Sequence, residues 1–264
     1  FISFASFVAF FPQLVAGPIE RAANLLPQFS NIRKFDYNNT VDGLRQIIWG
    51  FVKKTLIADQ CAETVNIIFN NSSSYQGSTL LIGAFLFSFQ IYGDFSGYSD
   101  IAIGTARLFG FNLKRNFSYP YFSKNIEDFW RRWHISLSSW FRDYIYIPLF
   151  NKIDDDDIID QTLVYKIQGI KITVITFLIS GLWHGANWTF IFWGLFHAIL
   201  FMPSLIFNAN KQYTSSIIAQ NKILLTLKEL FQVVKTFIIV TIGWIFFRSE
   251  SLTEAFNYLN NIFS

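Results

Sequence analysis

The longest uncharged stretch of this chain most constrains its fold. No Asp, Glu, Lys or Arg occurs from Ile172 to Asn210, a run of 39 residues. As an α-helix, which rises about 1.5 Å per residue, the run would extend roughly 60 Å. The hydrocarbon core of a bilayer is only about 30 Å thick. The run is therefore long enough to cross a membrane twice, with a turn between the two crossings.

One histidine lies inside this run. His184 follows Lys171 by 13 residues, so we expect it on the order of 20 Å along the first crossing. Trp183 and Trp188 flank it. Ionisable groups inside membrane segments are energetically costly and are functional candidates by default. His184 is therefore the leading candidate for a working residue, and the alternative is an imidazole that hydrogen-bonds a backbone carbonyl between helices.

Composition places the chain among membrane proteins. Hydrophobic residues make up 52% and charged residues only 15%, whereas average soluble domains carry about 25% charged residues. The net charge of +3 is small, and no basic stripe with stacking aromatics stands apart, which argues against a nucleic-acid partner. The single cysteine, Cys61, excludes a disulfide framework and a cysteine-based metal knuckle.

Further apolar segments predict an all-α fold. Residues 1–16, 79–93 and 231–247 are apolar, and residues 43–69 form an amphipathic helix pattern. Because only helices and closed barrels satisfy backbone groups in lipid, we predict a polytopic transmembrane helical bundle. We expect residues 1–264 to form a single membrane-embedded domain. The sole methionine is Met202, so we also expect this domain to be the C-terminal portion of a longer protein.

A second informative stretch, residues 126–149, repeats aromatic residues at helical spacing. We predict one amphipathic helix that ends at Pro148, with His134 at the seam between its apolar and polar faces. On the helical wheel Glu127 and Arg131 share the sector of His134. A functional and a structural role for His134 both remain open. The stretch also contains two i,i+4 pairs of opposite charge: Glu127–Arg131 and Asp128–Arg132.

Acidic residues elsewhere are interpreted as structural. Asp94 and Asp100 could form a proton-handling or metal pair, but capping of a broken helix near the membrane surface is the favoured interpretation. The aspartates at 154–157 lack the spacing of a calcium loop, which favours a solvated loop. The three histidines show no zinc-binding spacing, so no metal site is predicted. His197, the last of them, is interpreted as structural.

One deep histidine and one seam histidine suit general-base catalysis on a hydroxyl. A neutral imidazole at His184 would accept the proton of an acceptor hydroxyl that attacks an activated acyl carbonyl. Burial disfavours the charged imidazolium and so keeps the base neutral at rest. Asn187 or Arg131 could donate to the developing oxyanion. Trp183, beside His184, is a further substrate-binding candidate.

Four stretches together resemble the membrane-bound O-acyltransferase family, and within it the alginate O-acetyltransferase branch of bacterial polysaccharide acylases. They occur in this order and cover most of the chain up to His197: FFPQLVAGPIERAANLLPQF at 10–29, DFSGYSDIAIG at 94–104, FWRRWHISLSSWFRDYIYIPL at 129–149 and GLWHGANWTFIFWGLFHA at 181–198.

The resemblance implies a helical fold with interfacial and re-entrant helices around a central funnel. It implies a catalytic histidine at His184, in the WHG motif, and a second functional histidine at His134, in the RRWHISLS motif. The family moves an acyl group from a thioester donor, such as acetyl-CoA or an acyl carrier, to a hydroxyl handled outside. Membrane lipid and exported polysaccharide-acetylation proteins are then the expected partners. The expected location is the bacterial inner (cytoplasmic) membrane, and no bound cofactor is expected.

Two other functions remain as alternatives. One is D-alanyl transfer for teichoic acid modification, which the wording of PQLVAGPIE disfavours. The other is a proton-coupled transporter or a scaffold subunit of an export complex. A transporter typically shows paired, similar halves, and the chain shows no internal repeat. The segment after Leu149 departs from the family, because Phe150 and Asn151 stand where a Gly-Gly-Asn-Arg run is usual.

Overall fold

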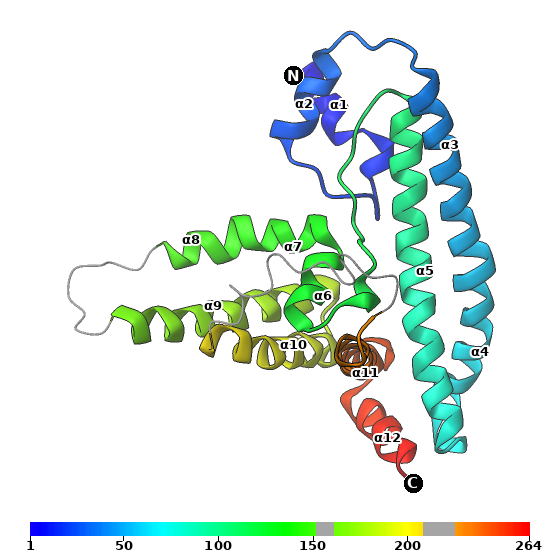
Figure 1. Ribbon diagram of the computed structural model, residues 1–264, viewed down its shortest axis with the longest axis vertical. Helices are drawn as coiled ribbons and strands as arrows, with labels where there is room; N and C mark the ends of the chain where they lie inside the picture. Colours follow the sequence, from blue (N-terminus) through cyan, green and yellow to red (C-terminus); the bar gives the residue numbers. More distant parts are fainter. Residues whose placement is uncertain (152–160, 208–224) are drawn as a thin grey trace. The chain divides into compact units, whose positions relative to one another are not determined.

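Helices account for every regular element in the described part of the chain. The computed structural model describes residues 1–151, 161–207 and 225–264. Within those ranges it contains helices and no strand, which confirms the predicted all-α class (Figure 1). Four helical segments there are long and apolar enough to cross a membrane: Ser78–Leu108, Val164–His184, Trp188–Ile206 and Leu227–Arg248. The aspartate cluster at 154–157 lies outside the described residues.

The chain divides into two compact units, which are described separately. Unit one comprises residues 1–70, 85–118 and 134–137, and unit two comprises residues 71–84, 119–133 and 138–264. Whether the two form the single predicted domain stays a prediction. The helices of unit one are α1 (Ile2–Val8), α2 (Ala22–Ser30), α3 (Tyr37–Phe51), α4 (Asp59–Asn70) and most of α5 (Ser78–Leu108), together with the start of α7 (Ile135–Phe141).

Close backbone approach holds α3 against α5 in unit one (Figure 1). A Cβ added to Gly97 would lie 2.7 Å from the carbonyl oxygen of Gly50, and one added to Gly104 would lie 2.5 Å from that of Gly43. Only glycine permits such proximity, so these residues fix the helix spacing. The amphipathic helix predicted over 43–69 is confirmed in type but is longer, because α3, a π-helical segment (Val52–Ala58) and α4 follow one another directly.

The predicted break next to the two aspartates of unit one is wrong. Asp94 and Asp100 lie inside the continuous helix α5, so they cap nothing. Instead each pairs with a lysine of the π-helical segment: Lys53 Nζ contacts Asp100, and Lys54 Nζ lies 2.7 Å from Asp94 Oδ1. Extra turns of apolar helix on both sides keep α5 regular, and the lysines neutralise the carboxylates.

The helices of unit two include a hairpin of two long helices. The described helices of this unit are α6 (Ile126–Arg132), the rest of α7, α8 (Ile147–Phe150), α9 (Gln161–His184), α10 (Trp188–Ile206), α11 (Leu227–Arg248) and α12 (Leu252–Ile262). The helices α9 and α10 form the two arms predicted from the uncharged run (Figure 1). A Cβ on Gly181 would lie 2.3 Å from the carbonyl oxygen of Phe190, and one on Gly194 equally close to that of Phe177. These two glycines let the arms pack closely.

The end of the chain adds two helices to unit two. Thr226 begins α11 with a capping box, in which its side chain and that of Glu229 satisfy each other's backbone N–H groups. Ser251 caps α12, a helix that the sequence pattern did not predict. Tyr258 of α12 is fully buried and donates its hydroxyl to the carbonyl of Leu80, 2.7 Å away. Burial raises the pKa of the Tyr258 hydroxyl, so it remains a donor.

The single helix predicted over residues 126–149 is wrong. The chain there forms α6, a break at Trp133 and His134, α7, a π-helical segment (Arg142–Tyr146) and α8. The break follows from the backbone of His134, whose φ of 42° lies in the left-handed region. Pro148 lies in the first turn of α8 and does not end the helical run, which continues directly from the π-helical segment to Phe150.

Candidate active site

His184 is the last residue of α9. The position predicted for it, part-way along a crossing, is therefore corrected to the end of a helix. The end arises locally: Gly185 has a φ of 154°, a conformation that glycine adopts readily, and Asn187 begins α10. Three residues thus turn the chain between the arms and leave the imidazole at the turn.

Aromatic rings surround the His184 imidazole without enclosing it. The centroid distances to the rings of Trp183 and Phe247 are both 4.9 Å, and that to Trp193 is 5.3 Å. These three contacts are edge-on, and a tilted contact to Phe190 adds a fourth. The side chain is only half-buried. The ring is therefore held in orientation by its neighbours while part of it stays accessible.

Asn187 is engaged with the backbone on both sides of its amide. Its Oδ1 accepts the N–H of Thr189 at 3.0 Å as the N-cap of α10, and its Nδ2 donates to the carbonyl oxygen of Glu250 at 2.9 Å. The cap explains why α10 begins at Trp188. An oxyanion that bound Asn187 would have to replace the bond to Glu250.

Trp183 combines contact with exposure. Its ring lies edge-on to His184, yet 55% of the residue is exposed. An exposed indole beside a half-buried imidazole provides a flat apolar surface that a substrate can contact.

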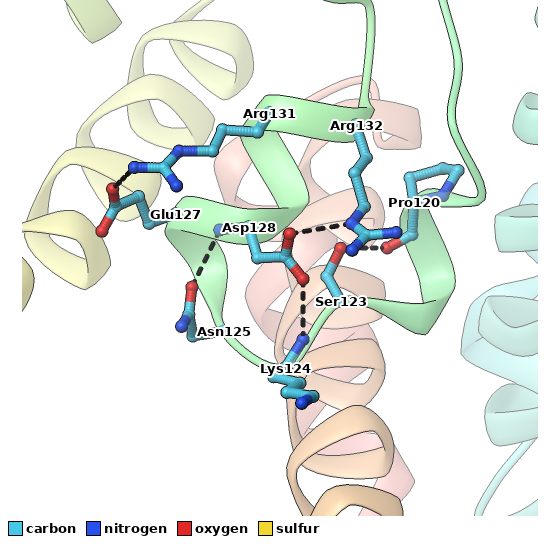
Figure 2. A network of polar contacts seen from close by, with 8 residues as sticks. All are labelled: Pro120, Ser123, Lys124, Asn125, Glu127, Asp128, Arg131 and Arg132. Atoms are coloured by element: carbon cyan, nitrogen blue, oxygen red, sulfur yellow. Dashed lines mark hydrogen bonds and ion pairs between the residues drawn. The ribbon is translucent and has the colours of Figure 1, made fainter. Parts of the chain in front are cut away.

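Helix α6 carries the predicted charge pairs (Figure 2). Arg131 pairs with Glu127, and Arg132 Nε lies 2.8 Å from Asp128 Oδ1, so both i,i+4 predictions are confirmed. Glu127 is buried, and burial raises the pKa of its carboxyl while the Arg131 guanidinium opposes part of that shift. Arg131 itself is 43% exposed and keeps donors available for another anion.

The start of α6 is fixed by its own capping groups. The Asn125 side chain accepts the N–H of Asp128 at 2.8 Å, and the Asp128 carboxylate accepts the backbone N–H of Lys124 (Figure 2). The Lys124 ammonium lies 2.9 Å from Glu229 Oε1, at the start of α11. Within unit two, α6 is therefore tied to α11 by an ion pair.

His197 lies in the aromatic core of unit two. It is fully buried, and neither ring nitrogen has a hydrogen-bond partner among the described residues. The rings of Trp130 and Trp193 each lie 5.1 Å from it, centroid to centroid. A Cβ added to Gly243 of α11 would approach its Nε2 to 2.9 Å. This packing is that of a core residue, in keeping with the structural interpretation, which stays a prediction.

His134 belongs to unit one, whereas His184 belongs to unit two. His134 is 5% exposed, and its ring packs edge-on against Phe95 of α5, with 4.6 Å between the ring centroids. Because the chain breaks here, the predicted position at the seam of one long helix, beside Glu127 and Arg131, is wrong. The left-handed backbone is costly for a residue with a Cβ.

Known proteins agree with the sequence resemblance. The sequence model of the MBOAT family, the membrane-bound O-acyltransferase family, matches residues 1–215 of this chain. The chain belongs to the membrane-bound O-acyltransferase family.

Curated relatives come from several branches of this family. The probable alginate O-acetylase AlgI of Azotobacter vinelandii is 39% identical over 100% of this chain and 48% of its own length. The peptidoglycan O-acetyltransferase of Helicobacter pylori is 37% identical over 99% of the chain and 46% of its own. The teichoic acid D-alanyltransferase of Bacillus subtilis is 32% identical over 78% of the chain and 52% of its own. The chain thus spans about half the length of these relatives.

No metal centre accompanies the family's motifs in the described ranges, where no group of three or more His, Cys, Asp or Glu side chains is placed to hold an ion. Three residues that contact the candidate base were not predicted from the sequence, namely Phe190, Trp193 and Phe247. Phe190 and Trp193 lie six and nine residues after His184, inside the same motif. Phe247 gave no signal, because it is one phenylalanine among 32 and lies on a helix far along the chain.

Proposed function

We propose that this chain carries the reaction centre of a membrane O-acetyltransferase that acts on an exported polysaccharide, with His184 as the general base. The observation that supports it is the half-buried imidazole of His184, oriented by three edge-on rings at the turn between two apolar helices of a family member. Such a ring is both fixed and reachable, which a base that serves two substrates requires.

The reaction is a transfer of an acyl group from sulfur to oxygen. His184 accepts the proton of an acceptor hydroxyl as its oxygen attacks the thioester carbonyl carbon. The carbon–sulfur bond then breaks, the thiolate leaves, and the imidazolium returns the proton to it. The products are an ester and a free thiol, and the base is regenerated. A positioned base contributes about 10² to 10⁴ in rate.

Other side chains would support this step. Arg131, with part of its guanidinium exposed, is proposed to stabilise negative charge on the donor or on the oxyanion. Asn187 is a second candidate donor at the turn, and Trp183 offers an apolar surface beside the base. His134 is proposed as the second functional histidine of the reaction, from its own unit.

Acetyl transfer is favoured over D-alanyl transfer by the extent of the similarity. The O-acetylating relatives match essentially the whole chain at 37 to 39% identity. The D-alanyltransferase of Bacillus subtilis matches 78% of it at 32%. A proton-coupled transporter or a non-catalytic scaffold has no comparable support.

The remaining parts of the proposal concern the whole protein. We assign it to the bacterial inner membrane, because four helical segments of the described chain could span a bilayer and the relatives are bacterial. The donor is proposed to be a thioester such as acetyl-CoA or an acyl carrier, and the partners to be exported polysaccharide-acetylation proteins. Residues 1–264 would act as one membrane-embedded domain within the whole protein.

The test uses the full-length protein in its own cells. Cells carrying His184→Ala or His184→Gln are pulse-labelled with radioactive acetate, and alkali-labile label in the envelope polysaccharide is measured. Both variants are expected to lower the initial rate of incorporation by about 10² or more, with unchanged abundance in the membrane.

Leu182→Ala is the matched control, since Leu182 lies two residues away on the same helix end and is 53% exposed. It is expected to incorporate label normally. Wild-type incorporation by the His184 variants would exclude the base assignment. Incorporation of labelled D-alanine in place of acetate would select the other branch.

A further inference from the structure

A buried asparagine connects two segments of unit one. Asn116, in the chain after α5, is fully buried. Its Nδ2 donates to the hydroxyl oxygen of Ser99, on α5, at 3.0 Å. Its Oδ1 accepts the hydroxyl of Ser136, and its backbone carbonyl accepts the N–H of Ile135 at 2.8 Å. One residue therefore ties α5 to the first two residues of α7.

A third segment joins through Ser136. The backbone N–H of Ile19, just after the Gly17-Pro18 break, donates to the Ser136 hydroxyl oxygen at 2.9 Å. The Ser136 hydroxyl thus accepts one bond and donates the other, to Asn116. Ile19, Ser99 and Ser136 each come from one of the three stretches that carry the resemblance in this unit. Their meeting point is the Asn116 side chain.

The bonds from Asn116 reach the two residues that follow His134. A left-handed residue with a Cβ costs of order 1 to 3 kcal/mol and persists only where its surroundings determine it. His134 has such a backbone, with a φ of 42°. Asn116 binds Ile135 through its carbonyl and Ser136 through its side chain. The imidazole itself packs edge-on against Phe95 of α5.

We propose that Asn116 is a positioning residue for the acyl-transfer reaction, one that holds His134 in its left-handed conformation through Ser136 and Ile135. The inference rests on the proposed role of His134 in that reaction. Asn116 contacts no reacting atom. It acts by fixing the orientation of the His134 imidazole. The hydroxyls of Ser99 and Ser136 in turn hold the Asn116 side chain through hydrogen bonds.

An asparagine suits this place for a definite reason. Its amide presents a donor to Ser99 and an acceptor to Ser136 at the same time. Alanine would leave both hydroxyls without these bonds in a buried site and would release one side of the Ser136 hydroxyl. Aspartate keeps an oxygen toward each serine, and the Ser99 hydroxyl can turn to donate to it. Aspartate should therefore preserve the connection in part.

The experiment measures acyl transfer by the full-length protein in cells pulse-labelled with radioactive acetate. Asn116→Ala is expected to lower the initial rate of alkali-labile label in the envelope about tenfold to a hundredfold, as small misplacements of reacting groups do. Asn116→Asp is expected to recover a clear part of that loss. Asn112→Ala, an exposed asparagine of the same segment, is the matched control and should match the wild type.

A double-mutant cycle separates positioning from mere stability. If Asn116 acts through His134, then the double variant Asn116→Ala/His134→Ala should incorporate label within about twofold of His134→Ala alone, because coupled residues are not additive. Independent losses that multiply would overturn the inference and leave Asn116 as a structural residue. Membrane abundance is measured for every variant.

Two outcomes distinguish this inference from the proposed function. Wild-type incorporation by His134→Ala would remove the role of that histidine, and the inference with it. A low rate of incorporation by His134→Ala together with a wild-type rate by Asn116→Ala would overturn the inference about Asn116 but would leave the proposed role of His134 standing. If Asn116→Ala fails to accumulate, Ser99→Ala replaces it in the cycle, since it deletes only the bond at Asn116 Nδ2. The same two outcomes then decide.

Discussion

Trp193 lies edge-on against the imidazole of His184, with 5.3 Å between the ring centroids and 87° between the ring planes. Trp193 is 1% exposed and also contacts His197 at 5.1 Å. An edge-on aromatic contact contributes about 0.5 to 1.5 kcal/mol beyond its buried area. The buried ring of Trp193 therefore helps to orient the accessible ring of His184 at the turn.

The first prediction tests this contact. Trp193→Phe keeps a ring edge near His184, whereas Trp193→Leu keeps apolar volume without a ring. Acetate incorporation should be about tenfold lower in the leucine variant than in the phenylalanine variant when the two are compared at equal abundance. Trp188→Leu, at a tryptophan that is 71% exposed, is the control and should have little effect. Equal rates in the two Trp193 variants would contradict the orienting role.

The second prediction separates the backbone of His134 from its imidazole. Asparagine tolerates the left-handed region, whereas a β-branched residue is a genuine outlier there. His134→Asn and His134→Val should both lose acyl transfer, but only His134→Val should also lose stability, by about 1 to 2 kcal/mol. Thermal unfolding of the detergent-solubilised protein measures the difference. Equal melting temperatures of the two variants at position 134 would contradict the backbone strain.

The third prediction concerns helix packing in unit one. A Cβ at Gly97 would lie 2.7 Å from the Gly50 carbonyl oxygen, so Gly97→Ala should force α3 and α5 apart. We expect a loss of about 1 to 3 kcal/mol in the free energy of unfolding, as overpacking typically causes.

Gly169→Ala is the matched substitution for this packing test. The nearest atom to a Cβ there is the Tyr146 hydroxyl oxygen at 3.7 Å, an ordinary contact. Because alanine favours the helix interior by about 1 kcal/mol over glycine, this variant should be as stable as the wild type or more so. A lower melting temperature for Gly97→Ala and an equal or higher one for Gly169→Ala, each relative to the wild type, would support the packing argument. An unchanged melting temperature for Gly97→Ala would refute it.

The fourth prediction is a pH dependence at Glu127. Burial raises the pKa of this carboxyl, so the folded state binds its proton at a pH at which the unfolded state does not. The contribution of Glu127 to stability therefore rises as the pH falls from 7 through the raised pKa. It levels off below the ordinary glutamate value of about 4.3.

Glu127→Gln should remove this contribution to the pH dependence and should leave stability at pH 7 unchanged or higher. Asp128→Asn is the contrasting variant. Asp128 pairs with Arg132 at 2.8 Å and accepts the Lys124 N–H, so its loss should lower the melting temperature at pH 7. Melting curves between pH 4 and pH 7 (roughly the glutamate window) compare the two. An equal loss of stability in both variants would contradict the assignment.

Local sequence signals predicted the two apolar helices of the hairpin and the charge pairs of α6. The 39 uncharged residues from Ile172 required two apolar helices, and α9 and α10 are those helices. The i,i+4 pairs of α6 formed as their spacing predicts. The motifs indicated the family, which the family model then matched over residues 1–215. Each of these features depends on residues close together in the chain.

Tertiary structure decided what surrounds each histidine. The sequence predicted one helix through His134, yet the chain breaks there, and the hydrogen bonds beside the break come from Asn116 and from Ile19, which is 117 residues away from Ser136. Likewise Phe247 reaches His184 from α11. A left-handed residue is unfavourable by itself, so only partners brought together by the fold can hold it. Helical periodicity is a local property of the chain, and it carries no information about such distant partners.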